Sequence, residues 1–154
     1  MKTKNLILTS LFIALAIVLP FVTVQLPQLG KMLALMHFPV IIAGLYLGPI
    51  SGLIVGFISP LLRMSLFGMP PLLMAICMSF ELATYGLITA ILKDKLNIYI
   101  NLIITIIGGR VVYCLVAMII INTTFLPTFI TTFTTAAIGI ILQLILIPQV
   151  IKRI

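Results

Sequence analysis

The stretch MAICMSFELATYGLITAIL, residues 74–92, is apolar throughout except for a few small hydroxyl side chains, one tyrosine and one carboxylate, Glu81. About 20 apolar residues in a helix cross the ~30 Å hydrocarbon layer of a membrane. An ionisable residue at the centre of such a helix costs roughly 2.5 to 3.5 kcal/mol on insertion scales, so it usually faces the protein interior and has a partner. The stretch therefore predicts a membrane-spanning helix that carries a buried polar site.

The composition of the whole chain extends this prediction to the whole protein. Of its 154 residues, 63% are hydrophobic and 7% are charged, and its mean hydropathy is +1.42. A soluble domain carries about 25% charged residues. The chain is therefore predicted to be a multi-pass protein of the cell membrane, with a single transmembrane domain over residues 1–154 that is surrounded by the lipid bilayer.

The hydropathy pattern predicts an all-α integral membrane protein with six transmembrane helices. They are expected over residues 5–24, 37–47, 49–67, 72–92, 98–121 and 128–151. The first run is too long for the apolar part of a signal peptide, and no small-residue cleavage site follows it. No loop is long enough for a soluble domain and no nucleotide-binding motif is present, so an ATPase that drove this protein would be another chain.

The basic residues predict the orientation. The net charge is +7, but Lys and Arg form no patch or stripe, so no nucleic-acid partner is expected. With six spans, three basic pairs fall on one side of the membrane: Lys2 and Lys4, Lys93 and Lys95, and Lys152 and Arg153. An excess of Lys and Arg marks the cytoplasmic side. Both termini are therefore expected to be cytoplasmic.

Small residues recur at helical spacing in two places. In GLYLGPISGLIVG, residues 44–56, Gly44, Gly48, Gly52 and Gly56 are four residues apart. This spacing lets helix backbones approach closely in lipid, either within the chain or against a partner. Because Pro49 lacks a backbone donor, two short helices are expected to join at Gly48–Pro49. In the first span, Ser10 and Ala14 make a similar pair, with the same two interpretations.

Three charges fall inside predicted spans, namely Arg63, Glu81 and Arg110. Glu81 and Arg110 are expected at similar depth, and Arg63 nearer the outer surface. An ion pair of Glu81 with either arginine leaves one positive charge over. Water, backbone carbonyls or an anionic ligand must satisfy it, and arginine binds a carboxylate or phosphate bidentately.

Neighbours at helical spacing enlarge this candidate site. Cys77 and Tyr85 share a helix face with Glu81, and Tyr113 and Cys114 follow Arg110 at the same spacing. The tyrosines either contact a ligand or pack in the core, and the cysteines are interpreted as small buried residues. On the outer side, two segments could close over a pocket: the loop that contains Gln25, Gln28 and Lys31, and the turn FGMPP at residues 67–71.

His37, at the start of the second span, is the only histidine in the chain. Without companions it predicts no metal site, and it is interpreted either as an interfacial residue or as a ligand contact. No nucleophile lies in a pattern that would pair it with a base. We therefore expect no catalytic residues, no cofactor and no enzyme activity.

Several segments together resemble the substrate-binding S components of energy-coupling factor (ECF) vitamin transporters. They are LTSLFIALAIVLP (8–20), MHFPV (36–40), GFISPLLR (56–63), FELATYG (80–86) and GGRVVY (108–113). The resemblance implies a six-helix protein that captures a small vitamin or vitamin precursor from outside. It also implies two kinds of partner, a transmembrane coupling subunit and two cytoplasmic ATPases. Pantothenate is slightly favoured as the ligand over cobalamin precursors or pyridoxine-type compounds, because its carboxylate fits the surplus positive charge.

The resemblance also bears on individual residues. The family's first helix meets the coupling subunit through A-x-x-x-A, and here Ser10 stands at the first position, so Ser10 and Ala14 are expected partner contacts. The candidate substrate-binding residues are His37, Arg63, Glu81, Tyr85, Arg110 and Tyr113. The alternative function is a stand-alone secondary transporter that uses Glu81 as a proton-coupled carboxylate. The energy source, ATP or a proton gradient, discriminates between the two.

Overall fold

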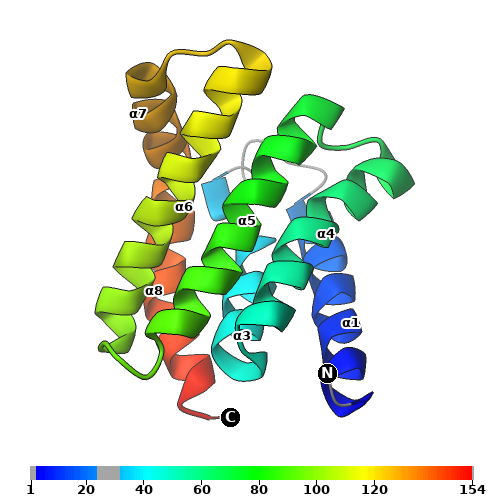
Figure 1. Ribbon diagram of the computed structural model, residues 1–154, viewed down its shortest axis with the longest axis vertical. Coiled ribbons are helices and arrows are strands. Elements are labelled where there is room, and N and C mark those ends of the chain that lie inside the picture. The colour runs from blue at the N-terminus through cyan, green and yellow to red at the C-terminus, as the bar shows by residue number, and fades with distance from the viewer. Residues whose placement is uncertain (1–2, 24–31, 154) are drawn as a thin grey trace.

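The computed structural model describes residues 3–23 and 32–153, and in this part of the chain every regular element is a helix (Figure 1). The elements are α1 (Thr3–Val18), the short 3-10 helix η1 (Leu19–Thr23), α3 (His37–Leu47), α4 (Pro49–Phe67), α5 (Leu72–Leu92), α6 (Ile98–Ile121), α7 (Phe125–Thr135) and α8 (Ala137–Ile151). The all-helical prediction is confirmed. Gln25, Gln28 and Lys31, predicted to lie in an outer loop, are outside the described residues.

Four helical segments of the described residues have the length and apolar character to cross a membrane: Thr3–Val22, α4, α5 and α6. The pair α7 and α8 makes a fifth if the two helices together form one bent span, and α3 is shorter than a full span. The chain thus has the helices of a membrane protein. A count of six spans stays a prediction, because it requires both α3 and the bent pair to cross.

The last predicted span is not one helix. Residues 128–151 were expected to be continuous, but helix begins at Phe125 and breaks at Ala136, and α7 and α8 are bent by 58°. The run TTFTT at residues 131–135 directly precedes the break, and threonine hydroxyls there bond to backbone carbonyls one turn back. Thr132 donates to Phe129 O at 3.0 Å and Thr134 to Ile130 O at 2.9 Å. Such bonds compete with regular helix and often bend it.

The chain ends and the α5–α6 turn lie at the same end of the helix bundle (Figure 1). We call this the basic end, because Lys93, Lys95, Lys152 and Arg153 belong to it. The opposite end, here the far end, contains the α4–α5 turn (68–71) and the α6–α7 turn (122–124). This arrangement brings together the described members of the three basic pairs, which the topology prediction placed on one side.

The spaced glycines Gly44, Gly52 and Gly56 let α3 and α4 pack closely against α5 within the chain. A Cβ on Gly44 would lie 2.5 Å from Gly86 O, and one on Gly52 would lie 2.6 Å from the same oxygen. A Cβ on Gly56 would meet the backbone of Leu82. The three helices therefore touch backbone to backbone, and α5 is held rigidly against its neighbours. The rest of the buried core includes Val40, Ile41, Val55, Leu102 and Ile147.

The junction between α3 and α4 lies at Gly48–Pro49, as predicted, and it requires glycine. Gly48 has φ 97° and ψ −178°, a region that residues with a side chain avoid. An added Cβ there would meet nothing within 4 Å, so backbone strain alone opposes substitution. We expect Gly48→Ala to lower the free energy of unfolding by about 2 kcal/mol, measured by thermal unfolding in detergent.

Gly68 provides the control for this prediction. It has φ 68° and ψ 7°, the left-handed helical region that asparagine tolerates, and it also has open space around it. Gly68→Asn should therefore leave the unfolding midpoint nearly unchanged. A Gly48→Ala protein as stable as Gly68→Asn would contradict the strain argument.

Candidate functional site

Glu81 lies at the middle of α5 and is almost completely buried, with 1% of its surface exposed. Cys77, Tyr85 and Thr89 lie on the same face at four-residue intervals and are buried as well. The spacing predicted this shared face for Cys77 and Tyr85. A carboxylate this deeply buried needs partners that compensate for its lost hydration.

The main partner is Arg110 on α6. Its Nη1 atom lies 3.0 Å from Glu81 Oε1, and only 7% of Arg110 is exposed. The sequence left two arginines as candidates, and the structure selects Arg110. The ion pair joins α5 to α6 inside the bundle, where breaking it by removing one partner is strongly unfavourable.

Two further side chains approach the same oxygen. Tyr85 donates from its hydroxyl to Glu81 Oε1 at 3.1 Å, and His37 Nε2 lies 3.7 Å from that atom. The ring of Tyr85 packs where Gly109 has no side chain, because a Cβ on Gly109 would overlap the ring carbons. The His37 ring lies 5.2 Å from the Tyr85 ring. We call these four residues, His37, Glu81, Tyr85 and Arg110, the Glu81 cluster.

Arg63 on α4 is half-buried and, unlike Arg110, lies against an aromatic ring. Among residues 3–23 and 32–153, no carboxylate lies within ion-pair distance of it, and its Cζ atom lies 5.8 Å from the centre of the Phe21 ring. In the same part of the chain, Nε of Arg63, Nε of Arg110 and Nε2 of His37 are buried without a hydrogen-bond partner. Two arginines thus face one carboxylate, and both of them have a nitrogen atom without a hydrogen-bond partner among the described residues.

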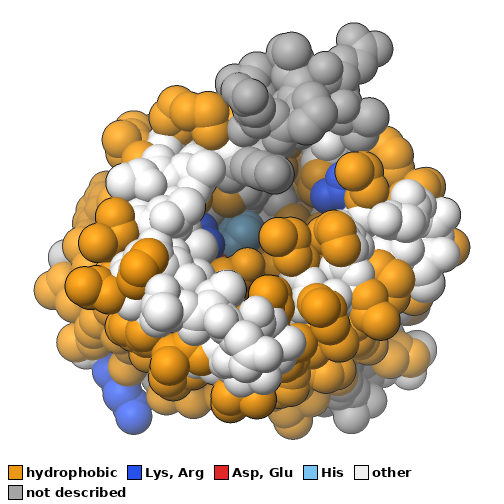
Figure 2. Space-filling model, turned by 90° about the horizontal axis from the view of Figure 1, so that it is seen from above, with side chains coloured by type: hydrophobic (Ala, Val, Ile, Leu, Met, Phe, Trp, Pro, Cys, Tyr) orange, Lys and Arg blue, Asp and Glu red, His pale blue; other side chains and the backbone are white. Residues whose placement is uncertain are grey.

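The far end of the molecule is hollowed (Figure 2). Histidine and Lys or Arg side chains show within and beside this hollow, and hydrophobic side chains surround it. The chain has a single histidine, His37, so the histidine side chain that shows in the hollow belongs to the Glu81 cluster. The exposed turn at residues 67–71 belongs to the same end, and its closure over a ligand stays a prediction.

Among the described residues, the remaining predicted residues form no hydrogen bond or ion pair with the Glu81 cluster. Tyr113 is half-buried on α6, one helical turn from Arg110. Cys77 and Cys114 are both buried and unbridged. Ser10 and Ala14 are exposed on α1, where Ser10 Oγ donates to Leu6 O at 3.1 Å. No group of three metal-binding side chains occurs in the part of the chain that the structure describes.

A second buried polar group connects α5 to α6 nearer the basic end, and sequence reasoning missed it. Asn101 Nδ2 donates to Thr89 O at 2.9 Å, and Thr105 Oγ1 donates to Asn101 Oδ1 at 3.2 Å. The signal was the four-residue spacing of Asn101 and Thr105 in an otherwise apolar helix. In these bonds the polar groups of Thr89, Asn101 and Thr105 are partners of one another, and no charged group is involved. We therefore interpret this group as structural.

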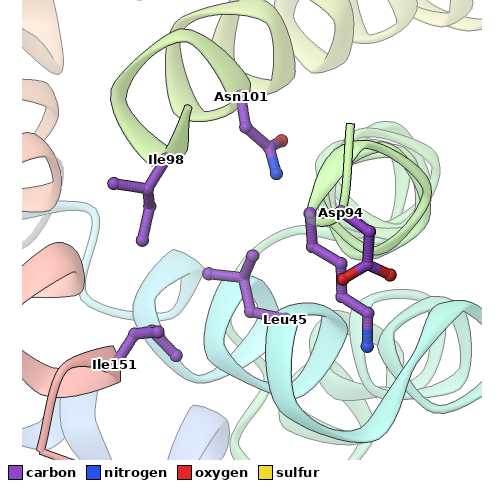
Figure 3. A pocket seen from close by; sticks show the side chains of 6 residues that line it. Leu45, Asp94, Ile98, Asn101 and Ile151 are labelled. Atoms are coloured by element: carbon purple, nitrogen blue, oxygen red, sulfur yellow. The ribbon is translucent and has the colours of Figure 1, made fainter. Parts of the chain in front are cut away.

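A pocket of about 370 Å³ lies beside this group at the basic end (Figure 3). Its lining side chains are Leu45, Lys93, Asp94, Ile98, Asn101 and Ile151. One basic and one acidic side chain face it, both from the exposed α5–α6 turn. The pocket therefore lacks the buried, unbalanced charge that distinguishes the far end.

A comparison with protein families supplies independent information. The family described as "ECF transporter, substrate-specific component" matches residues 4–154, which is nearly the whole chain. No curated protein and no solved structure matches the chain.

Proposed function

This chain belongs to the family of substrate-specific components of ECF transporters, and from that premise we propose that it captures a small acidic vitamin or vitamin precursor. The ligand would enter from outside through the hollow at the far end. Its acid group would bind the unused nitrogens of Arg63 and Arg110. The observation that carries this proposal is the unbalanced positive charge at the Glu81 cluster and Arg63.

The charge count supports an acidic ligand. Without counting His37, α4 to α6 bring two arginines and one carboxylate into the interior, which leaves one positive charge over. A proton on His37 would add to this surplus. Nη1 of Arg110 contacts Glu81, and Nε of the same guanidinium has no hydrogen-bond partner in the described residues. Because the guanidinium has five donors in a planar fork, a ligand carboxylate can bind its other edge while Glu81 stays in place.

Pantothenate is the ligand we favour slightly among the vitamins. It carries one carboxylate, which fits the surplus positive charge, and its hydroxyl and amide groups suit the tyrosines. Tyr113 would line the part of the site nearer the far end, since it follows Arg110 on α6 by one helical turn. His37 and Tyr85 would form its base, because both approach Glu81.

The proposal includes partners. A transmembrane coupling subunit would dock on α1, where Ser10 and Ala14 are exposed and small enough for close helix contact. Two cytoplasmic ATPases would supply the energy, and both chain termini would lie on their side of the membrane, as the basic end suggests. No observation favours the proton-coupled carrier in its place, because Glu81 Oε1 already contacts Arg110 and Tyr85.

Arg63→Gln tests the proposal directly. A lost charge-assisted hydrogen bond costs about 1.5 to 3 kcal/mol, so the dissociation constant should rise about 10- to 100-fold. Folding should be unaffected, because Arg63 is half-exposed and has no carboxylate partner in the described residues. The measurement is calorimetric binding of pantothenate and a panel of vitamins and precursors to the purified chain, without ATP.

Matched variants make the outcome decisive. Arg63→Lys keeps the charge and should retain part of the affinity, and Lys93→Gln, at the basic end, should bind as the unchanged protein does. Wild-type affinity in Arg63→Gln would contradict a role of Arg63 in acid recognition. A folded protein that bound no member of the panel would contradict the capture of a vitamin.

A further inference from the structure

A backbone carbonyl next to His37 determines which nitrogen of its imidazole ring carries a hydrogen. The carbonyl oxygen of Ala34 accepts the backbone N–H of His37 at 3.0 Å and also lies 3.0 Å from His37 Nδ1. Ala34 has φ 47°, in the left-handed region. A carbonyl oxygen can only accept a hydrogen bond, so Nδ1 must carry a hydrogen. This bond selects the form of the imidazole ring.

The other ring nitrogen then faces a carboxylate. In a neutral imidazole with a hydrogen on Nδ1, Nε2 presents a lone pair. His37 Nε2 is buried without a hydrogen-bond partner in the described residues, and Glu81 Oε1 is 3.7 Å away. Two acceptors that face each other away from water repel. A proton between them turns this repulsion into a charge-assisted hydrogen bond once a small movement closes the gap.

We propose that His37 carries a second proton, on Nε2 toward Glu81, and that it is a positioning residue for acid recognition. This inference rests on the proposed function above. His37 acts through Glu81, which it holds in the orientation that contacts Arg110. The Arg110 guanidinium then keeps its Nε edge available for the ligand. The proton also cancels the charge of Glu81 locally, so both arginines attract the ligand's acid group.

The groups around this proton are few. From α5, Glu81 and Tyr85 face His37, and the Tyr85 hydroxyl already donates to the same carboxylate oxygen. From α6, Arg110 contacts that oxygen. Among residues 3–23 and 32–153, Arg63 on α4 is the remaining charge of the far half. α8 packs against α3 without any titratable side chain, and α1 packs against α3 with Lys4 at the basic end as its only charged residue. The groups that approach Oε1 therefore come from three helices: His37 from α3, Tyr85 from α5 and Arg110 from α6.

The chain offers a direct test, because His37 is its only histidine. Nitrogen NMR of protein with ¹⁵N-labelled histidine and a histidine-free tag reports a single imidazole. We expect both ring nitrogens to be protonated in the ligand-free protein at neutral pH. In Glu81→Gln we expect a neutral ring with its hydrogen on Nδ1. A neutral ring with a bare Nε2 in the unchanged protein would overturn the proposal.

Binding by two variants tests the positioning role. His37→Gln retains an amide donor toward Glu81 and should bind an acidic ligand within about threefold of the unchanged protein. His37→Phe keeps a ring but no donor, and should weaken binding about tenfold, as expected for one lost hydrogen bond. Equal affinities for both variants would contradict the role. The NMR result needs no ligand, so failure of the vitamin panel and failure of this inference are separate outcomes.

Discussion

Arg110→Gln should abolish ligand capture and also destabilise the fold. Removing one partner of a buried ion pair costs about 3 to 5 kcal/mol, because the other charge is left uncompensated. Here that charge is Glu81, with 1% of its surface exposed. Loss of the Arg110 contacts should further raise the dissociation constant for an acidic ligand by about 100-fold or more. Thermal unfolding and calorimetric binding in the same detergent measure the two effects.

The double variant Glu81→Gln/Arg110→Gln separates the two causes. It removes both charges and keeps side chains of similar shape, so we expect it to recover most of the stability that Arg110→Gln loses. It should still not bind an acidic ligand, because the guanidinium is gone. A double variant that is folded and binds as tightly as the unchanged protein would show that Arg110 is structural only.

The second large effect is expected at Gly86, where α5 meets α4. A Cβ on Gly86 would overlap the backbone carbonyl of Gly52, and a backbone atom cannot rotate away. Gly86→Ala must therefore push α4 and α5 apart. We expect it to lower the free energy of unfolding by about 3 kcal/mol or more, although alanine is the better helix former by about 1 kcal/mol. Thermal unfolding of the purified variant measures the loss.

Gly108→Ala is the matched control on α6. The same substitution there meets only Ile88 Cδ1, the end of a flexible side chain, at 2.7 Å. Gly108→Ala should be neutral or slightly stabilising because of its helix propensity. If Gly86→Ala unfolds at the same temperature as Gly108→Ala, the close backbone contact between α4 and α5 does not contribute as argued.

The close contact of α4 and α5 also explains how the site is held. Glu81 lies on the same helix as Gly86, and the glycine contacts fix the rotation of α5 about its axis. That rotation turns the Cys77, Glu81 and Tyr85 face toward α3 and α6. Sites on rigid elements hold their geometry more precisely than sites on loops.

Part of the candidate site followed from local spacing. Glu81 and Tyr85 are one helical turn apart, so their shared face and their hydrogen bond could be anticipated. The similar depth of Glu81 and Arg110 made their ion pair one of two options. His37 had no such signal. Its contact with Glu81 depends on a turn before α3 and on the packing of α3 against α5, and neither leaves a pattern in the residues around it.

The sequence by itself determined that this is an all-helical membrane protein with glycine-packed helices, a junction at Gly48–Pro49 and a surplus of buried positive charge. Hydropathy, spacing and proline chemistry act over one or two helical turns, so they can be read locally. Only the tertiary structure decided that Arg110, and not Arg63, pairs with Glu81, that His37 joins them, and that α7 and α8 bend at Ala136. The first two outcomes depend on how helices that are far apart in the chain are rotated and packed against one another. The bend depends on whether the backbone hydrogen bonds of a helix continue through one particular turn.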